Sequence, residues 1–250
     1  MDQFNSSDII CVSKNKDYLG VSLKKKKHTK ADPTLINLAL NRAFAFDSGI
    51  IEYISEITNN FFCKLLKDNF NSIKGANGLT KASQITTENW RKYIDLIKPQ
   101  ALEALKSDKS IFIPIISKLK ANANNIADIL LDTVLKTSLK ELKKKNFDFA
   151  LCTGIGDYTK RTKIRIWPAH YVDIDTLSTV ISDLVSKGKP TLSFNKSSFV
   201  PGGSYAGIRF TLSIGKFPVC DMEIRYKGKL GADPSFTATL SDTFKNVLEK

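Results

Sequence analysis

The sequence predicts one α/β or α+β domain with a mixed central β-sheet and a helical middle section. Strand-like segments lie near both ends of the chain, and the stretch between them has helical periodicity. Of the 250 residues, 42% are hydrophobic, which is enough for a buried core. We expect a single domain over 1–250, with an N-terminal hairpin (8–24), a helical section (48–145) and a mixed α/β section (146–250).

The N-terminal segment has the pattern of a β-hairpin. "IICV" and "YLGVSL" are rich in β-branched and aromatic residues, and "KNKD" between them has turn chemistry. A turn at Asn15-Lys16 would place Asp8 opposite Leu23, to within one residue of register, and therefore close to Ser22 and Lys24. Ser22 and Lys24 share one face of their strand, because strand side chains alternate with a period of two.

Three helices are predicted in the middle section. The first begins near Ser48 and ends before "KGANG". The second contains Trp90 and ends at Pro99, and the third runs from about 126 to 145. All three have apolar residues at helical spacing, so each should bury one face.

The last hundred residues mix strands and helices. "FDFALCTGI" reads as a buried strand, and "KIRIW" and "HYVDI" as shorter ones. Asp175 is expected to cap a helix that stops at Gly188. "GIRFTLSI" and "VCDMEIRYKG" should be strands joined by a turn at Gly215-Lys216, and a last helix should begin near Ser241.

Charge is the strongest global signal. The chain has 38 Lys and Arg against 25 Asp and Glu, a net charge of +13 that attracts polyanions such as nucleic acid. No apolar run is long enough to cross a membrane, and the first residues do not resemble a signal peptide, so we expect a cytoplasmic protein without a membrane partner. The four cysteines are scattered in apolar contexts and are expected to be reduced core residues.

Asp8, Ser22 and Lys24 form the first candidate catalytic site. An Asp on one strand and a triplet ending in Lys on the next resembles the PD-(D/E)xK, or restriction-endonuclease-like, nuclease superfamily, with Asp8 and Ser22-Leu23-Lys24 as the matching residues. The resemblance implies a restriction-endonuclease-like core and a Mg²⁺ (or Mn²⁺) ion bound by Asp8 and the Leu23 backbone carbonyl. It also implies that Lys24 acts at the attacking water.

The sequence departs from that family at two points. Ser22 stands where the family usually has Asp or Glu, which removes one metal ligand. Only seven residues precede Asp8. The family's first helix and strand would therefore come from elsewhere in the chain, from a second copy in a homodimer or from a partner chain that completes the sheet, or they would be absent.

A second candidate site lies in "PVCDMEIRYKGK". Asp221, Glu223, Arg225 and Lys227 would project from one strand face, with the intervening apolar residues on the core side. Asp221, Glu223 and Lys227 could serve a nuclease site. The same stripe could also be the solvated face of an antiparallel strand with paired charges, and Arg209 and Arg225 could bind phosphates instead.

The sequence therefore leaves two functions open. One is a Mg²⁺-dependent endonuclease acting on DNA, similar to type II restriction or phage nucleases. The other is a non-catalytic nucleic-acid-binding protein, either a degenerate nuclease fold or a viral structural or packaging protein. In both cases DNA is the expected partner, with RNA as an alternative, and it would be held by the basic residues Lys25, Lys26, Lys27, His28, Lys30, Lys160, Arg161, Lys163, Arg165, Arg209 and Arg225.

Overall fold

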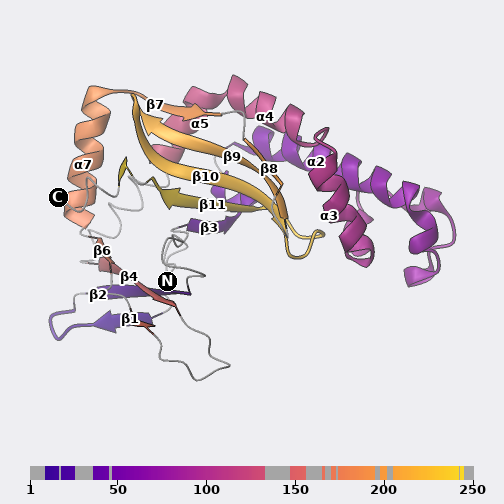
Figure 1. Ribbon diagram of the computed structural model, residues 1–250, viewed down its shortest axis with the longest axis horizontal. Coiled ribbons are helices and arrows are strands. Elements are labelled where there is room, and N and C mark those ends of the chain that lie inside the picture. Colours follow the sequence, from indigo (N-terminus) through magenta and orange to yellow (C-terminus); the bar gives the residue numbers. More distant parts are fainter. Residues whose placement is uncertain are drawn as a thin grey trace.

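The structure, a computed structural model, describes residues 9–16, 18–25, 36–44, 47–132, 147–155, 165–166, 170–172, 174–194, 198–201, 205–241 and 243–244. These residues form two β-sheets and a set of helices (Figure 1). The mixture of helix and sheet confirms the predicted class at that level.

The first sheet has five strands: β1 (Ile9–Val12), β2 (Tyr18–Lys25), β4 (Phe147–Ile155), β5 (Arg165–Ile166) and β6 (His170–Val172). β1 and β2 form the predicted antiparallel hairpin, whereas β2 and β4 are parallel. Parallel neighbours require a long connection, and the helical middle of the chain lies between these two strands in sequence.

The hairpin register differs by one residue from the prediction. Ile9 pairs with Val21, whereas Asp8 opposite Leu23 would require Ile9 to pair with Ser22. The difference arises in the loop. Val12 pairs with Tyr18, and the turn is closed by the Lys16 amide, which donates to the Ser13 carbonyl at 3.1 Å.

The second sheet has six strands, and all of their pairings are antiparallel. Its order is β3 (Ile36–Ala39), β11 (Ser235–Leu240), β10 (Phe217–Lys227), β9 (Tyr205–Ile214) and β7 (Pro190–Ser193), and β8 (Phe199–Pro201) also pairs with β9. The prediction of one central sheet is therefore wrong. The β9–β10 hairpin closes on itself through Gly215 and Lys216, and other antiparallel strands occupy both of its edges, so it does not extend the sheet of β2 and β4.

Helices cover one face of the second sheet (Figure 1). The α-helices are α1 (Leu40–Ala43), α2 (Ser48–Asp68), α3 (Lys98–Ser107), α4 (Phe112–Ala121), α5 (Ala123–Leu130) and α7 (Ile174–Lys187). Short 3₁₀ segments link α2 to α3: η1 (Phe70–Ser72), η2 (Ala76–Gly78), η3 (Ala82–Gln84), η4 (Trp90–Lys92) and η5 (Ile94–Ile97). The Ile50 amide at the start of α2 donates to Asp47 Oδ1 at 3.0 Å, a side-chain cap.

Two helix boundaries differ from the predictions. Pro99 lies in the first turn of α3 rather than at the end of a helix, because a proline is tolerated where the amide has no partner within the helix. Asp175 lies inside α7, which begins at Ile174, so it does not precede the helix as a cap. α2 and the stop of α7 before Gly188 match the predictions, and residues 133–145 of the third predicted helix lie outside the described residues.

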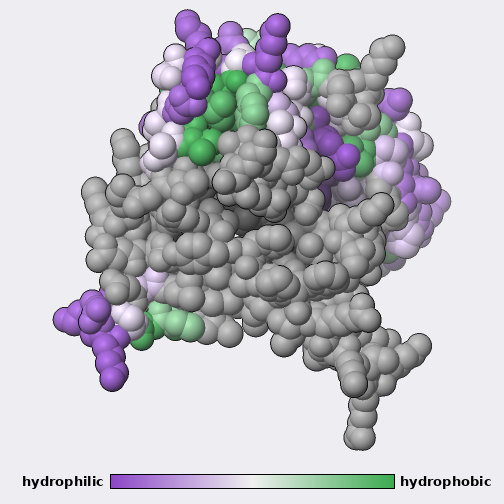
Figure 2. Space-filling view, turned by 60° about the vertical axis from the view of Figure 1, so that its left-hand side comes forward, coloured by the Kyte–Doolittle hydropathy of each residue, from purple (hydrophilic) through white to green (hydrophobic). Residues whose placement is uncertain are grey.

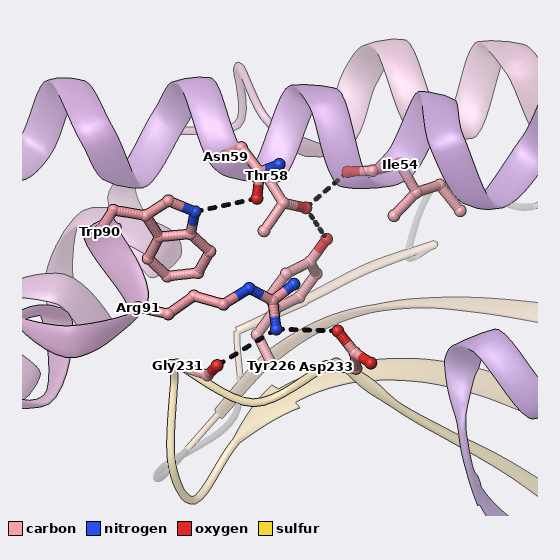
Figure 3. A network of polar contacts seen from close by, with 8 residues as sticks. All are labelled: Ile54, Thr58, Asn59, Trp90, Arg91, Tyr226, Gly231 and Asp233. Atoms are coloured by element: carbon pink, nitrogen blue, oxygen red, sulfur yellow. Dashed lines mark hydrogen bonds and ion pairs between the residues drawn. The ribbon is translucent and has the colours of Figure 1, made fainter. Parts of the chain in front are cut away.

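A polar network fixes β10 to the helices (Figure 3). Tyr226 Oη lies 2.8 Å from Thr58 Oγ1, which itself donates to the Ile54 carbonyl at 2.7 Å. Nearby, Trp90 Nε1 donates to Asn59 Oδ1 at 2.9 Å, and its ring stacks on Phe62 with centroids 4.8 Å apart. These contacts hold the apolar face of β10 against α2 and leave its other face for the polar side chains.

Figure 2 shows polar side chains around small apolar patches on the face that it views. Within the described ranges, no helix is long and apolar enough to cross a membrane. Cys63 and Cys220 are buried as predicted, but Cys11 is exposed, because it lies on β1 at the edge of the first sheet.

Candidate functional site

The structure describes the first candidate site only in part. Asp8 lies outside the described residues, and β2 carries Ser22, Leu23 and Lys24, which pair through the backbone with Leu151, Cys152 and Thr153 of β4. Lys25 ends β2, and Arg165 begins β5 opposite Ile155. The other predicted nucleic-acid contacts in this half lie outside the described residues: Lys26, Lys27, His28, Lys30, Lys160, Arg161 and Lys163.

The second candidate site is described in full, and it lies on the face of the second sheet that faces away from the helices. Met222, Ile224 and Tyr226 are buried in the core, which confirms the predicted alternation along β10. Asp221, Glu223, Arg225 and Lys227 therefore occupy the opposite face. The register places Arg209 directly across from Glu223, and Gly207 across from Arg225.

Glu223 is the centre of this arrangement. Its side chain is only 5% exposed, and its Oε2 accepts hydrogen bonds from Arg225 Nη2 at 2.8 Å and from Arg209 Nη2 at 3.4 Å. Arg209 is 48% exposed and Arg225 is 26% exposed. One buried carboxylate thus holds two guanidinium groups side by side, and both still reach the solvent.

Tyr205 and Lys227 extend the cluster, and they are paired across the hairpin. The guanidinium of Arg225 lies over the Tyr205 ring, 5.2 Å from its centroid. Burial raises the pKa of Tyr205, and the negative charge of Glu223 adds to this effect. Burial lowers the pKa of Lys227, and the neighbouring Arg225 charge acts in the same direction.

This geometry favours anions over metal ions. Mg²⁺ needs several oxygen ligands, but Glu223 Oε2 is already bound by two cations, and Asp221 Oδ1 accepts a hydrogen bond from Thr211 Oγ1 at 2.8 Å. No group of three metal-ligating side chains is present within the ranges that the structure describes. The guanidinium groups, by contrast, have donors to spare for phosphate or carboxylate oxygens.

Three members of this face were not predicted from the sequence. Ser198 is buried and lies beside Arg209, whose amide donates to the Ser198 carbonyl at 2.6 Å. Gly207 lies between Tyr205 and Arg209 on the same face, and Thr237 is buried opposite Glu223 on β11. Strand alternation could have assigned Gly207 to this face, but no local signal marks Ser198 or Thr237.

Comparisons with known proteins give no family for this chain. No protein-family model matches it, and neither a curated protein nor a solved structure proved similar.

Proposed function

We propose that this protein binds nucleic acid and that Arg209, Arg225 and Lys227 on the β9–β10 hairpin contact backbone phosphates. The observation that carries this proposal is the pair of partly exposed guanidinium groups held by the buried carboxylate of Glu223. A net charge of +13 supports it, because a field of this sign attracts polyanions before contact.

The hydrogen-bonding capacity of the arginines supports the same function. A guanidinium has five N–H donors, and within the part of the chain that the structure describes Arg209 uses one of them, in a long contact of 3.4 Å to Glu223. Because Arg209 is 48% exposed, its remaining donors are open to a ligand. The contact to Glu223 limits the rotamers of both arginines, so less entropy is lost when a phosphate binds.

Fluorescence anisotropy with labelled duplex DNA, single-stranded DNA and RNA tests the proposal. We expect micromolar or tighter binding that weakens steeply as salt rises, because phosphate contacts release counterions. Arg209→Ala should weaken binding about fivefold to tenfold and lower the salt slope by about one. Lys187→Ala, which removes an exposed charge paired with Asp183 on α7, serves as the matched control and should have little effect.

Two results would contradict this proposal. Absent or salt-independent binding would remove the nucleic-acid function itself. Equal losses of nucleic-acid affinity in Arg209→Ala and Lys187→Ala would show that binding depends only on the net charge of the protein. The β9–β10 face would then not be the contact surface.

A second candidate is the Mg²⁺-dependent endonuclease with Asp8, Ser22 and Lys24 in its site. The observation that favours it is the position of β2, which lies between the antiparallel β1 and the parallel β4, with Asp8 next in sequence before β1. If it is correct, the protein should nick a supercoiled plasmid with Mg²⁺, and both EDTA and Asp8→Ala should abolish nicking. Cutting that survives Asp8→Ala but is lost in Glu223→Ala would instead assign the chemistry to β10.

A further inference from the structure

Three unpaired buried polar atoms lie on the same face of the second sheet, within the described residues. Within the described part of the chain, Ser198 Oγ, Glu223 Oε1 and Arg225 Nε are buried without a hydrogen-bond partner. They lie on one face of three neighbouring strands: Ser198, just before β8, lies beside Arg209 of β9, and Arg209 lies across from Glu223 of β10, two residues from Arg225. Such atoms are rare because they destabilise a fold, and each of them calls for a partner from outside the chain.

Gly207 lies at the centre of this cluster. A Cβ at this position would stand 2.4 Å from the Ile224 carbonyl oxygen and 3.3 Å from Glu223 Oε1. Glycine is therefore required for the close approach of β9 and β10, and it leaves no side chain against the carboxylate oxygen. We call the position bounded by Tyr205, Arg209, Glu223 and Arg225 around Gly207 the Gly207 notch.

The unpaired atoms specify the chemistry of the ligand. Glu223 Oε1 can only accept a hydrogen bond, Arg225 Nε can only donate one, and the Ser198 hydroxyl can do either. An ionised phosphate cannot satisfy Glu223 Oε1, because its oxygens are acceptors. A nucleobase edge carries N–H donors next to nitrogen or carbonyl acceptors, and it can satisfy all three atoms.

We propose that the Gly207 notch binds a single nucleotide, with the base edge on Glu223, Arg225 and Ser198 and the phosphate on Arg209 and Lys227. The phosphate part of this inference rests on the proposed nucleic-acid function. Entry requires a side chain to move, since Glu223 is 5% exposed. The Arg209 side chain should move most easily, because it is 48% exposed and its contact to Glu223 is long, at 3.4 Å.

Isothermal titration with the four nucleoside 5′-monophosphates and with inorganic phosphate tests the inference. At least one nucleotide should bind about tenfold or more tightly than phosphate, the size expected for hydrogen bonds to a charged buried group. Glu223→Gln should lower this nucleotide-to-phosphate ratio about tenfold, because its one amide oxygen is needed by the two arginines and an NH₂ donor then replaces the free acceptor. Asp221→Asn removes a negative charge from the same strand face but outside the notch, and it should leave the ratio unchanged.

The inference is overturned if phosphate binds as tightly as all four nucleotides, or if Glu223→Gln leaves the ratio unchanged. If Glu223→Gln fails to fold, Ser198→Ala tests the inference instead. This variant removes a hydroxyl that has no partner among the described residues, so the protein should fold and its nucleotide-to-phosphate ratio should fall. Binding of polymers without any nucleotide preference would overturn the inference and leave the proposed function standing. Mononucleotide binding without polymer binding would overturn the proposed function alone.

Discussion

Arg225 Nη2 donates to Glu223 Oε2 across 2.8 Å, although only one residue separates the two on β10. Side chains two apart on a strand point to the same face, so this contact lies along the strand rather than across the sheet. Arg209 reaches the same oxygen from β9. The negative charge of Glu223 is thus balanced by one arginine on β10 and by another on β9. Because it is balanced in this way, the carboxylate can be buried on this face.

Removing the Arg225 side chain should lower the stability of the protein. Arg225→Ala removes the 2.8 Å hydrogen bond to the buried Glu223 and leaves the longer 3.4 Å contact to Arg209, so we expect a loss of about 2–3 kcal/mol in the free energy of unfolding. The double variant Glu223→Leu/Arg225→Met should lose less, because no uncompensated charge remains. Urea denaturation measures both, and a double variant less stable than Arg225→Ala would disprove this account.

Ionisation of the buried Tyr226 should destabilise the protein at high pH. Burial raises the pKa of Tyr226 from 10.0 to about 12, although the hydrogen bond with Thr58 opposes this. The stabilisation is therefore complete below pH 10 and is lost as the pH rises through about 12. Wild type should lose about 2–3 kcal/mol more than Tyr226→Phe over this range, measured by urea unfolding at each pH. Parallel pH profiles for the two proteins would contradict the prediction.

Two glycines should respond to alanine in opposite ways. At Gly207 a Cβ would meet the Ile224 carbonyl oxygen at 2.4 Å, so Gly207→Ala should lower the melting temperature, with a loss of about 2 kcal/mol or more. At Gly49, near the start of α2, a Cβ would meet only Asp47 Oδ1 at 3.4 Å, and Gly49→Ala should stabilise the helix by up to about 1 kcal/mol. Thermal unfolding followed by circular dichroism distinguishes the two. A Gly207→Ala protein as stable as wild type would show that the strands lie further apart.

Cys11 should be the reactive thiol among the three described free cysteines. It is exposed on β1, whereas Cys63 and Cys220 are buried, and burial raises the pKa of Cys220 to about 12. A disulfide-exchange reagent at pH 8 should therefore modify Cys11 quickly, and Cys63 and Cys220 only after unfolding. Cys11→Ser should remove one fast-reacting thiol per chain, and an unchanged number of fast thiols would contradict the prediction.

Local patterns in the sequence predicted several elements correctly. The apolar spacing after Ser48 predicted α2, and the alternation around Glu223 predicted which β10 side chains face the core. The positive net charge predicted an attraction to polyanions, which stays a prediction. These features depend on residues close together in the chain, because helix and strand periodicity are local properties.

The sequence by itself thus determined the polar stripe of β10 and the turn at Gly215-Lys216, but the tertiary structure decided what the stripe faces. Phe217 pairs with Ile214 and Pro218 with Ser213, yet beyond an irregularity between Pro218 and Cys220 the register shifts, and Cys220 pairs with Leu212. Without that shift Glu223 would lie across from Ile208 instead of Arg209. Where a strand accommodates one extra residue depends on packing across the whole sheet, and here that packing brings a buried carboxylate and two arginines together.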